Sequence, residues 1–266
     1  MVSLTPGLSC ISSAGEGDDR KALYAAFFSG LDLLRCIDED AKKTLGQLSS
    51  IQRVDHKFPY ISSLPKHDKP QEYVHFKIIG LHSDQQTYRL LYVAELLGEN
   101  KGQILIKFTH RYSIELHAFC AKHGRAPRIH GFGSLPGGWF AVAMDYISTG
   151  LHPPQVLDLT TALIEKWATQ LTTIMQSFHN EQLVHGDLRG PNIICHGEDL
   201  DVMLIDFDWG GKVGKAKYPQ ARLCAELIDG RNDTDPKITK GDDERVLKNT
   251  IEQLKRRSTV ASNVAS

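Results

Sequence analysis

The sequence lacks the features that would assign it at once to a secreted, membrane or zinc-binding class of protein. Its five cysteines lie far apart without a CxxC pair, and its twelve histidines form no four-ligand set with zinc spacing. No apolar run approaches the roughly 18 residues that span a bilayer. The first residues contain neither the basic nor the apolar stretch of a secretory signal. We therefore expect a cytoplasmic or nuclear protein.

An excess of charge of one sign is also lacking. Thirty-one Lys and Arg oppose thirty-two Asp and Glu, so the net charge is −1. A chain this balanced has no domain-wide basic field to recruit nucleic acid or an anionic membrane, and we expect neither as a partner. Its 266 residues, 41% of them hydrophobic, are enough for one large domain or two lobes with a sizeable core.

The N-terminal part of the chain divides into three segments. Residues 1–19 are small and polar, which predicts a disordered start. From Arg20 to Leu48 apolar residues recur at three- and four-residue steps, which predicts an amphipathic helix that either packs on the main domain or binds a partner. Residues 50–70 hold three prolines among polar residues, which predicts a linker or extended arm.

Beyond residue 70 the pattern is first β-rich and then helical. Short alternating segments separated by turns predict antiparallel strands, and apolar residues at helical spacing predict a long helix after them. Ser113 is the expected cap of a short helix between the strands. The predicted elements are strands at 72–81, 87–97 and 103–109, a helix at 113–123, strands near 129–133 and 139–147, a helix at 158–179 and a strand at 202–205.

Two polar loops after apolar strands carry the residues with catalytic potential. Asp187 lies in the first loop with Asn192 five residues later, and Asp206 follows the second strand. Carboxylate and amide oxygens suit Mg²⁺, which accepts few protein ligands and keeps the rest of its shell for water and phosphate. Phosphoryl transfer needs such a cation, positioning groups and a carboxylate that accepts the proton of the attacking hydroxyl. The two loops contain all of these groups.

The first loop, HGDLRGPN at 185–192, resembles the catalytic loop of the protein-kinase superfamily, and Asp-Phe-Asp at 206–208 stands where that family has Asp-Phe-Gly. The resemblance implies an α+β, bilobal protein-kinase-like fold with an antiparallel-sheet N-lobe and a shortened helical C-lobe. The implied boundaries are 1–70 for the start, helix and arm, 71–147 for the N-lobe, 148–255 for the compact C-lobe and 256–266 for a flexible tail.

The same resemblance implies roles for the residues of the two loops. Asp187 corresponds to the catalytic base, and Asn192 and Asp206 correspond to the Mg²⁺ ligands. Arg189 stands where serine/threonine kinases usually carry Lys and is the expected contact of the γ-phosphate. Because an Arg side chain is always charged, this exchange preserves the charge but alters the geometry.

Weaker matches lie upstream in the expected order. Lys107 ends an Ile-Leu-Ile-Lys run that resembles the lysine-bearing strand of protein kinases. The resemblance implies that Lys107 contacts the α- and β-phosphates of ATP. Glu115 is the expected ion-pair partner of Lys107, although its position in the first helical turn also suits the helix dipole. Met144, Asp145, Tyr146 and Ile147 resemble the gatekeeper and hinge, which implies adenine contacts from the backbone of the last three.

Several features depart from the family pattern. The glycine-rich phosphate-binding loop is missing between the first two strands, where the turn is HSDQQ at 82–86. Only 60 residues follow Asp206, too few for a full helical lobe. The pattern most resembles compact fungal kinase-like proteins related to the kinase domains of Crinkler-type effectors. That resemblance implies that Asp242 or Asp243 braces the catalytic loop.

Three functional hypotheses follow. The leading one is an ATP- and Mg²⁺-dependent phosphotransferase that acts on Ser/Thr hydroxyls of a protein substrate, favoured over a small molecule because of Arg189. The first alternative is a weakly active or inactive pseudokinase scaffold that binds nucleotide or a partner protein, favoured by the missing glycines and the short C-lobe. The second alternative is a small-molecule kinase of the aminoglycoside or choline type, which requires an acidic pocket that the sequence does not reveal.

Overall fold

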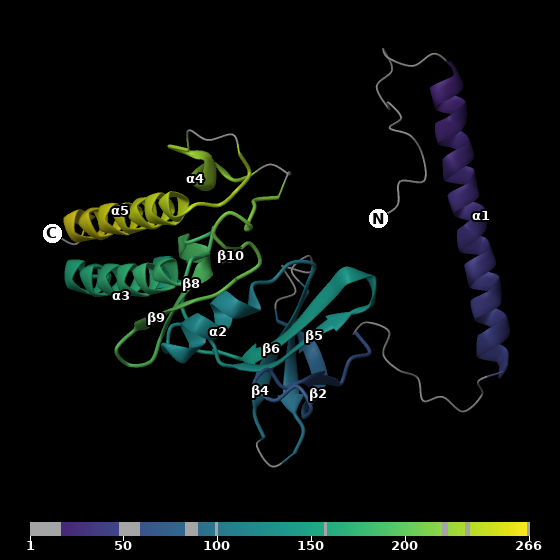
Figure 1. Cartoon of the computed structure of the whole chain (residues 1–266), viewed down its shortest axis with the longest axis horizontal. Coiled ribbons are helices and arrows are strands. Elements are labelled where there is room, and N and C mark those ends of the chain that lie inside the picture. Colours follow the sequence, from purple (N-terminus) through teal and green to yellow (C-terminus); the bar gives the residue numbers. More distant parts are fainter. Residues whose placement is uncertain are drawn as a thin grey trace. The chain divides into compact units, whose positions relative to one another are not determined.

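The computed structural model describes residues 17–47, 59–82, 90–98, 101–156, 159–219, 223–231 and 235–264. The chain divides into two compact units, residues 1–57 and 58–266. The first contains helix α1 (Gly17–Gln47), so the helix predicted from the apolar spacing is present (Figure 1). Its packing on the main domain stays a prediction. The predicted disordered start up to residue 16, the arm at 50–58 and the turn at 83–86 lie outside the described residues.

The N-lobe of the second unit is a six-stranded antiparallel sheet. Inward-facing residues alternate along its strands, and Phe76, Ala94 and Ile106 are completely buried between the sheet and its surroundings. The three-stranded meander and the two later strands predicted from the alternation are confirmed. In sheet order the strands are β1 (Ser63–Pro65), β2 (Tyr73–Leu81), β3 (Leu91–Leu96), β4 (Gln103–Thr109), β6 (Trp139–Asp145) and β5 (Ile129–Leu135).

Strand β1 lies within residues 50–70, which the prolines predicted to be a linker or arm. Leu64 of β1 is buried in the core of the sheet, and its backbone pairs with Val74 of β2. The N-lobe therefore begins before residue 71, because one apolar side chain and an edge pairing are enough to fix a strand that contains Pro65.

Helix α2 (Ile114–Lys122) follows β4, and its cap is the predicted one. The Ser113 hydroxyl accepts a hydrogen bond from the Leu116 N–H at 3.4 Å. Leu116 and Cys120 are completely buried in the core of the C-lobe, while α2 also contacts β5 of the sheet. This helix therefore connects the two lobes.

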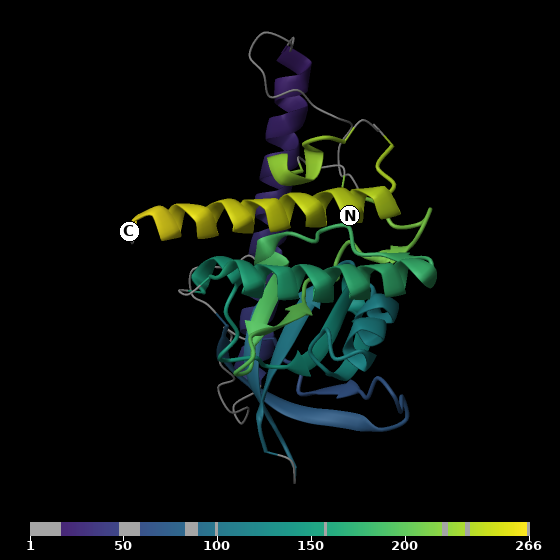
Figure 2. The same cartoon turned by 90° about the vertical axis from the view of Figure 1, so that its left-hand side faces the viewer.

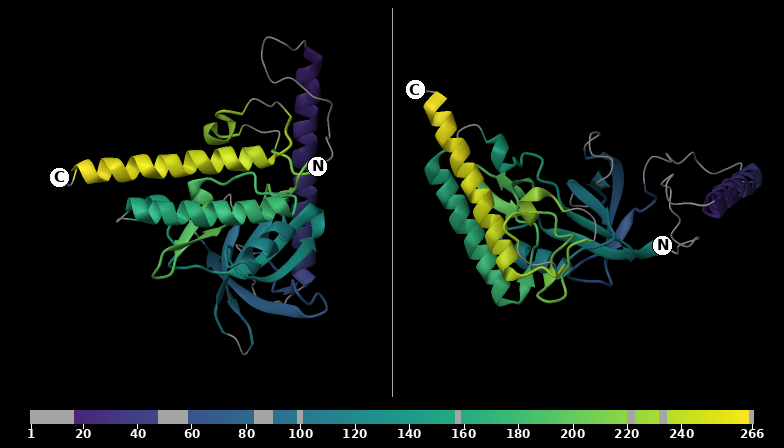
Figure 3. Two further views of the ribbon diagram at one scale, coloured as in Figure 1. Left: turned by 60° about the vertical axis from the view of Figure 1, so that its left-hand side comes forward. Right: turned by 90° about the horizontal axis from the view of Figure 1, so that it is seen from above.

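The C-lobe is built on two long helices, α3 (Thr161–Asn180) and α5 (Lys240–Val264), which lie alongside each other (Figures 2 and 3). Trp167 and Phe178 of α3 pack with Leu247 and Leu254 of α5 in its core. The remaining elements are short pairs and turns. They are β7 (Leu183–Val184) with β10 (Gly211–Lys212), β8 (Ile193–His196) with β9 (Asp201–Leu204), α4 (Ala225–Ile228) and the 3-10 turns η2 (Pro136–Gly138), η3 (Pro153–Gln155) and η4 (Gly190–Asn192).

The segment at 256–266, predicted to be a flexible tail, belongs to α5 as far as Val264. Ser258 is buried, and its hydroxyl donates to the Leu159 carbonyl at 2.8 Å. The segment is therefore helical rather than flexible over its described residues, and the exposed Arg256 and Arg257 are consistent with a solvated helix end. Within the described residues, no helix has the length and apolarity needed to cross a membrane.

Candidate functional site

The residues predicted to carry chemistry lie on two loops that a short hairpin brings together. The first loop, residues 185–192, leads from β7 through η4 into β8, and the second, residues 206–208, follows β9. Because β8 pairs with β9, the Ile205 N–H donates to the Asn192 carbonyl at 3.0 Å. Asn192 and Asp206, the predicted cation ligands, therefore lie at the same end of one hairpin.

A buried aspartate of α5 holds the start of the first loop. The carboxylate of Asp243 accepts hydrogen bonds from the N–H groups of His185 at 2.8 Å and Gly186 at 2.7 Å. His179 of α3 approaches the same carboxylate with Nε2 at 3.1 Å. Asp243 is completely buried, so its charge is compensated by these donors alone rather than by water. Asp243, of the two predicted alternatives, is the brace of the loop.

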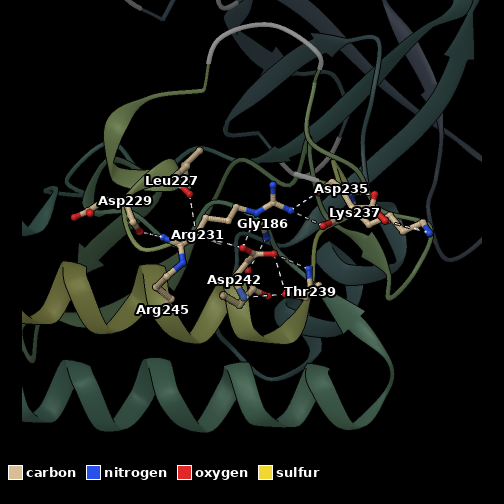
Figure 4. Close-up of polar contacts among 10 residues, drawn as sticks. Gly186, Leu227, Asp229, Arg231, Asp235, Lys237, Thr239, Asp242 and Arg245 are labelled. Atoms are coloured by element: carbon tan, nitrogen blue, oxygen red, sulfur yellow. Dashed lines mark hydrogen bonds and ion pairs between the residues drawn. The ribbon is translucent and has the colours of Figure 1, made fainter. Parts of the chain in front are cut away.

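The neighbouring Asp242 binds a different segment of the chain (Figure 4). Its carboxylate pairs with Arg231 Nε at 3.0 Å and Arg245 at 3.2 Å, and it accepts a hydrogen bond from the Thr239 hydroxyl at 2.8 Å. Arg231 also donates to the Lys237 carbonyl at 2.8 Å. Asp242 therefore ties the chain before α5 to the first turn of that helix.

Asp187, the predicted catalytic base, is buried and already engaged by protein groups. Arg189 grips its carboxylate with two nitrogens, Nε on Oδ1 and Nη2 on Oδ2, the latter at 2.9 Å. The third nitrogen of the fork binds Glu226 of α4 at 2.9 Å. The hydrogen bonds that Arg189 donates to Asp187, together with the Glu226 carboxylate, raise the pKa of the guanidinium, which stays charged. Asn192 Nδ2 donates to the Asp187 carbonyl at 3.0 Å.

Lys107 connects β4 of the N-lobe to the second loop. Its Nζ lies 2.5 Å from Asp206 Oδ1 and 2.6 Å from Asp208 Oδ1, and the lysine is 8% exposed. Burial alone would lower the pKa of Lys107, but the two carboxylates outweigh it and raise the pKa above its ordinary value. Asp206 has φ +65°, a conformation that non-glycine residues adopt mainly at sites that hold them there.

The predicted ion pair between Lys107 and Glu115 is wrong. The side chain of Glu115 is 58% exposed and lies 3.4 Å from Lys212. Glu115 is the second residue of α2 and faces outward, while Leu116 faces the core. Its negative charge therefore interacts favourably with the positive end of the helix dipole. The carboxylates that hold Lys107 come from the second loop instead.

The predicted hinge residues lie at the end of β6, on the strand that pairs with β4. Met144 is buried, and Tyr146 packs edge-on against the ring of His82 with centroids 5.5 Å apart. The Asp145 N–H donates to the Arg128 carbonyl at 2.9 Å. Adenine contacts at this hinge would therefore fall to the Asp145 carbonyl and to the backbone of Tyr146 and Ile147.

The donor set at the hairpin fits one divalent cation of the Mg²⁺ type. Because Asn192 Nδ2 donates to the Asp187 carbonyl, its amide oxygen is the atom that could bind a cation beside the Asp206 carboxylate. In the described part of the chain, no group of three or more His, Cys, Asp and Glu side chains could hold a metal by itself. Two protein ligands leave the rest of an octahedral shell to water and phosphate.

Three members of the site were not assigned these contacts from the sequence. The place of Asp208 in the motif predicts an added carboxylate near the cation but not its pairing with Lys107, and the partners of Glu226 depend on the position of α4. Thr109, whose hydroxyl donates to Asp208 Oδ2 at 3.2 Å, had a usable signal. It lies two residues after Lys107 on one strand, and such residues share a face of the sheet.

Comparisons with known proteins agree with this architecture. A family model for the RIO domain, an atypical branch of the protein-kinase-like superfamily, matches residues 139–222, which include both loops. The solved structure of the kinase PK-1 of Cydia pomonella granulovirus is similar, with a TM-score of 0.54 and 17% identity over 67% of each chain. No curated protein sequence matches this chain. The chain therefore has a protein-kinase-like fold, as its two loop motifs predicted.

Proposed function

We propose that the protein is an ATP- and Mg²⁺-dependent phosphotransferase that transfers the γ-phosphoryl group to Ser/Thr hydroxyls of a protein substrate. The observation that carries the proposal is the contact of Lys107 with Asp206 at 2.5 Å. The contact joins the buried ammonium group of Lys107, on the N-lobe, to the loop at 206–208 of the C-lobe, which follows the hairpin strand paired with the one after Asn192. A nucleotide held at this junction would meet a lysine, a cation site and a base together.

Each residue has a task in the proposed reaction. Asp187 orients the acceptor hydroxyl and accepts its proton, while Lys107 neutralises the α- and β-phosphates. Asn192 and Asp206 would hold the cation, which would supply positive charge to offset the negative charge of the phosphates. The loop that carries Asp187 is fixed by buried hydrogen bonds to Asp243, so the base is positioned before substrate arrives.

Arg189 connects the base to the acceptor side of the site. Two of its nitrogens grip Asp187, and the third is taken by Glu226. A contact with the γ-phosphate would use the nitrogen that now binds Glu226, because the other two hold the base in place. We therefore assign Arg189 to both the base and the transferred group.

A nucleotide-binding scaffold of low activity is the second candidate. It is favoured by the pairing inside the site, where Lys107 lies between two carboxylates and Arg189 between two others. A ligand has to exchange with these pairs before it can react, and a protein that retained them would bind nucleotide and turn over slowly.

The surface beside Glu226 bears on the charge of the acceptor. Glu226 also lines a groove of about 580 Å³ between α4 and α5, together with Asp229, Glu252 and Arg256. Its carboxylates favour a positively charged acceptor, either a basic segment around a Ser/Thr hydroxyl or a cationic small molecule. We therefore include basic peptides, acidic peptides, an aminoglycoside and choline as acceptors.

The test combines phosphate transfer with nucleotide binding. Purified protein is incubated with labelled ATP, Mg²⁺ and each acceptor, and Mg²⁺-ATP binding is followed by thermal shift. We expect Asp187→Asn to lower transfer at least about 100-fold and to retain the thermal shift, and Asp206→Asn to lose both. Glu115→Gln, an exposed change outside the site, is the matched control.

The outcomes separate the candidates. Transfer that depends on Asp187 supports the enzyme, and the acceptor panel then identifies its substrate class. A thermal shift without transfer in the unmodified protein supports the scaffold. The absence of both transfer and thermal shift contradicts every nucleotide-dependent hypothesis.

A further inference from the structure

The partners of Lys107 differ from those that its place in a kinase-like fold predicts. Its Nζ lies between two carboxylates of one short loop, 2.5 Å from Asp206 and 2.6 Å from Asp208. Both side chains are about three-quarters buried, at 29% and 27% exposure, so the ion pairs are only partly screened by water. One of these carboxylates, Asp206, is also a cation ligand in the proposed function. The other, Asp208, has no role in the proposed reaction.

Asp208 also has a contact on its second oxygen. Oδ2 lies 3.2 Å from the Thr109 hydroxyl, whose single proton is shared with the Arg111 carbonyl at 3.0 Å, while Oδ1 pairs with Lys107. Lys107 and Thr109 lie two residues apart on β4 and so project from the same face of the strand. Asp208 therefore contacts two neighbouring side chains of one N-lobe strand, one through each carboxylate oxygen.

The backbone beside Asp208 is attached to the start of helix α2. The Ser113 N–H donates to the Phe207 carbonyl at 3.0 Å, and the ring of Phe207 stacks on His117 of α2 with centroids 4.5 Å apart. The loop at 206–208 is thus attached to β4 through side chains and to the start of α2 through its backbone. Glu115 takes no part in these attachments, because it pairs with Lys212.

We propose that Asp208, and not Glu115, is the positioning residue that holds Lys107 toward the nucleotide phosphates. The inference rests on the proposed function. If Asp206 turned to a cation, Lys107 would need a second carboxylate to stay oriented, and Asp208 would supply it because it already lies 2.6 Å from Nζ on a loop whose backbone is attached to Ser113. The lysine is then held by the loop that carries the cation ligand, and a displacement of Glu115 leaves it in place.

The functional test is a split between KM and kcat. Asp208→Asn preserves the shape of the side chain and removes its charge, and we expect it to raise the KM for ATP about tenfold and to change kcat less than about threefold. Asp208→Glu, which restores the charge, should recover part of that loss. Glu115→Gln should leave both constants within about twofold. An unchanged KM in Asp208→Asn, a loss confined to kcat, or an equal effect of Glu115→Gln would overturn the proposal.

A second test needs no activity. A double-mutant cycle measured by urea unfolding combines Lys107→Met with Asp208→Asn, and in parallel Lys107→Met with Glu115→Gln. We expect the first pair to be coupled, so that the unfolding constant of the double mutant differs about tenfold from the product of the single effects, and the second pair to be additive.

The two tests separate the two proposals. If the unmodified protein neither binds Mg²⁺-ATP nor transfers phosphate, the proposed function fails, and the cycle still decides which carboxylate holds Lys107. Additivity of Lys107 with Asp208, or coupling of Lys107 with Glu115, overturns the assignment of Asp208 whether or not the protein is active.

Discussion

The two loops of the site are held in opposite ways. The loop at 185–187 is fixed by Asp243, a carboxylate with no exposed surface that binds two backbone N–H groups. The backbone of the loop at 206–208 is attached to Ser113, but its two carboxylates, each more than a quarter exposed, are held by ion pairs with Lys107. Ligands rarely displace buried hydrogen bonds to backbone, whereas phosphates and cations exchange readily with accessible charge pairs. We therefore expect the first loop, the permanent loop, to stay fixed when a ligand binds, and the carboxylates of the second, the ligand-responsive loop, to exchange their ion pairs.

The largest effect that this comparison predicts is on the permanent loop. Asp243→Ala leaves the N–H groups of His185 and Gly186 without their acceptor in a buried place, and we expect a loss of about 4 kcal/mol in the free energy of unfolding. The measurement is urea unfolding followed by circular dichroism. Glu244→Ala, one residue further and exposed, should change stability by less than about 0.5 kcal/mol. Equal losses in the two variants would contradict the permanent role of Asp243.

The second prediction concerns pH and the histidine that stacks on the ligand-responsive loop. Burial lowers the pKa of His117 to about 4 in the folded protein, against about 6.5 when unfolded. As the pH falls through 6.5 the unfolded state takes up a proton that the folded state does not, so stability decreases until about pH 4. The total loss is about 3 kcal/mol.

The matched variant for this prediction is His117→Gln, whose amide can replace the contacts to Tyr112 and to the Pro127 carbonyl. We expect the unfolding free energy of the unmodified protein to fall about 3 kcal/mol more than that of the variant between pH 7 and pH 4. Parallel pH curves would show that His117 does not couple protonation to folding.

The third prediction concerns the stability cost of adding a side chain to the permanent loop. Gly186 has φ +82°, and a Cβ there would lie 2.7 Å from Ile238 Cδ1 in the core. Gly186→Ala therefore combines backbone strain with overpacking, at about 2 kcal/mol. Gly197 also has a positive φ, +73°, but its Cβ would meet open space. Gly197→Ala should cost about 1 kcal/mol from strain alone, and equal costs for the two would exclude the packing contribution.

The smallest predicted effect is a change in Mg²⁺-ATP affinity when the ion pair between Glu226 and Arg189 is weakened. Glu226 binds the nitrogen of Arg189 that the proposed function assigns to phosphate. Glu226→Gln weakens that pair, and we expect Mg²⁺-ATP to bind about two- to threefold more tightly, with unfolding unchanged within about 0.5 kcal/mol. Isothermal titration measures the affinity, and Asp229→Asn is the control on the same groove. Weaker binding in Glu226→Gln would show that the pair supports the nucleotide site.

The elements with local signals were predictable from the sequence. The strands of the sheet follow from alternation, and the start of α2 follows from Ser113, because a strand face and a helix cap depend on neighbouring residues. The kinase-like fold was implied by the resemblance of the two loop motifs to those of the protein-kinase superfamily. These signals need no knowledge of how distant segments meet.

Contacts between distant segments were not predictable in the same way. Glu115 was paired with Lys107 by its order along the chain, but a helix turns about 100° per residue, and the rotation of α2 directs Leu116 inward and Glu115 outward. The turn of about 100° per residue also directs Asp242 and Asp243 of α5 to different segments, although they are adjacent in the sequence. Such assignments depend on packing, which the sequence pattern does not specify to one residue.

The brace of the first loop also constrains the order in which the protein folds. Asp243 lies 58 residues after His185 and 57 after Gly186, the two positions whose N–H groups it binds. A nascent chain synthesised as far as β10 already contains every residue of both loops, yet lacks the carboxylate that shapes one of them. Because contacts of such long range form late, the site is completed only when the first turn of α5 docks. The geometry of the first loop is therefore set by a residue of α5 that is synthesised well after the loop itself.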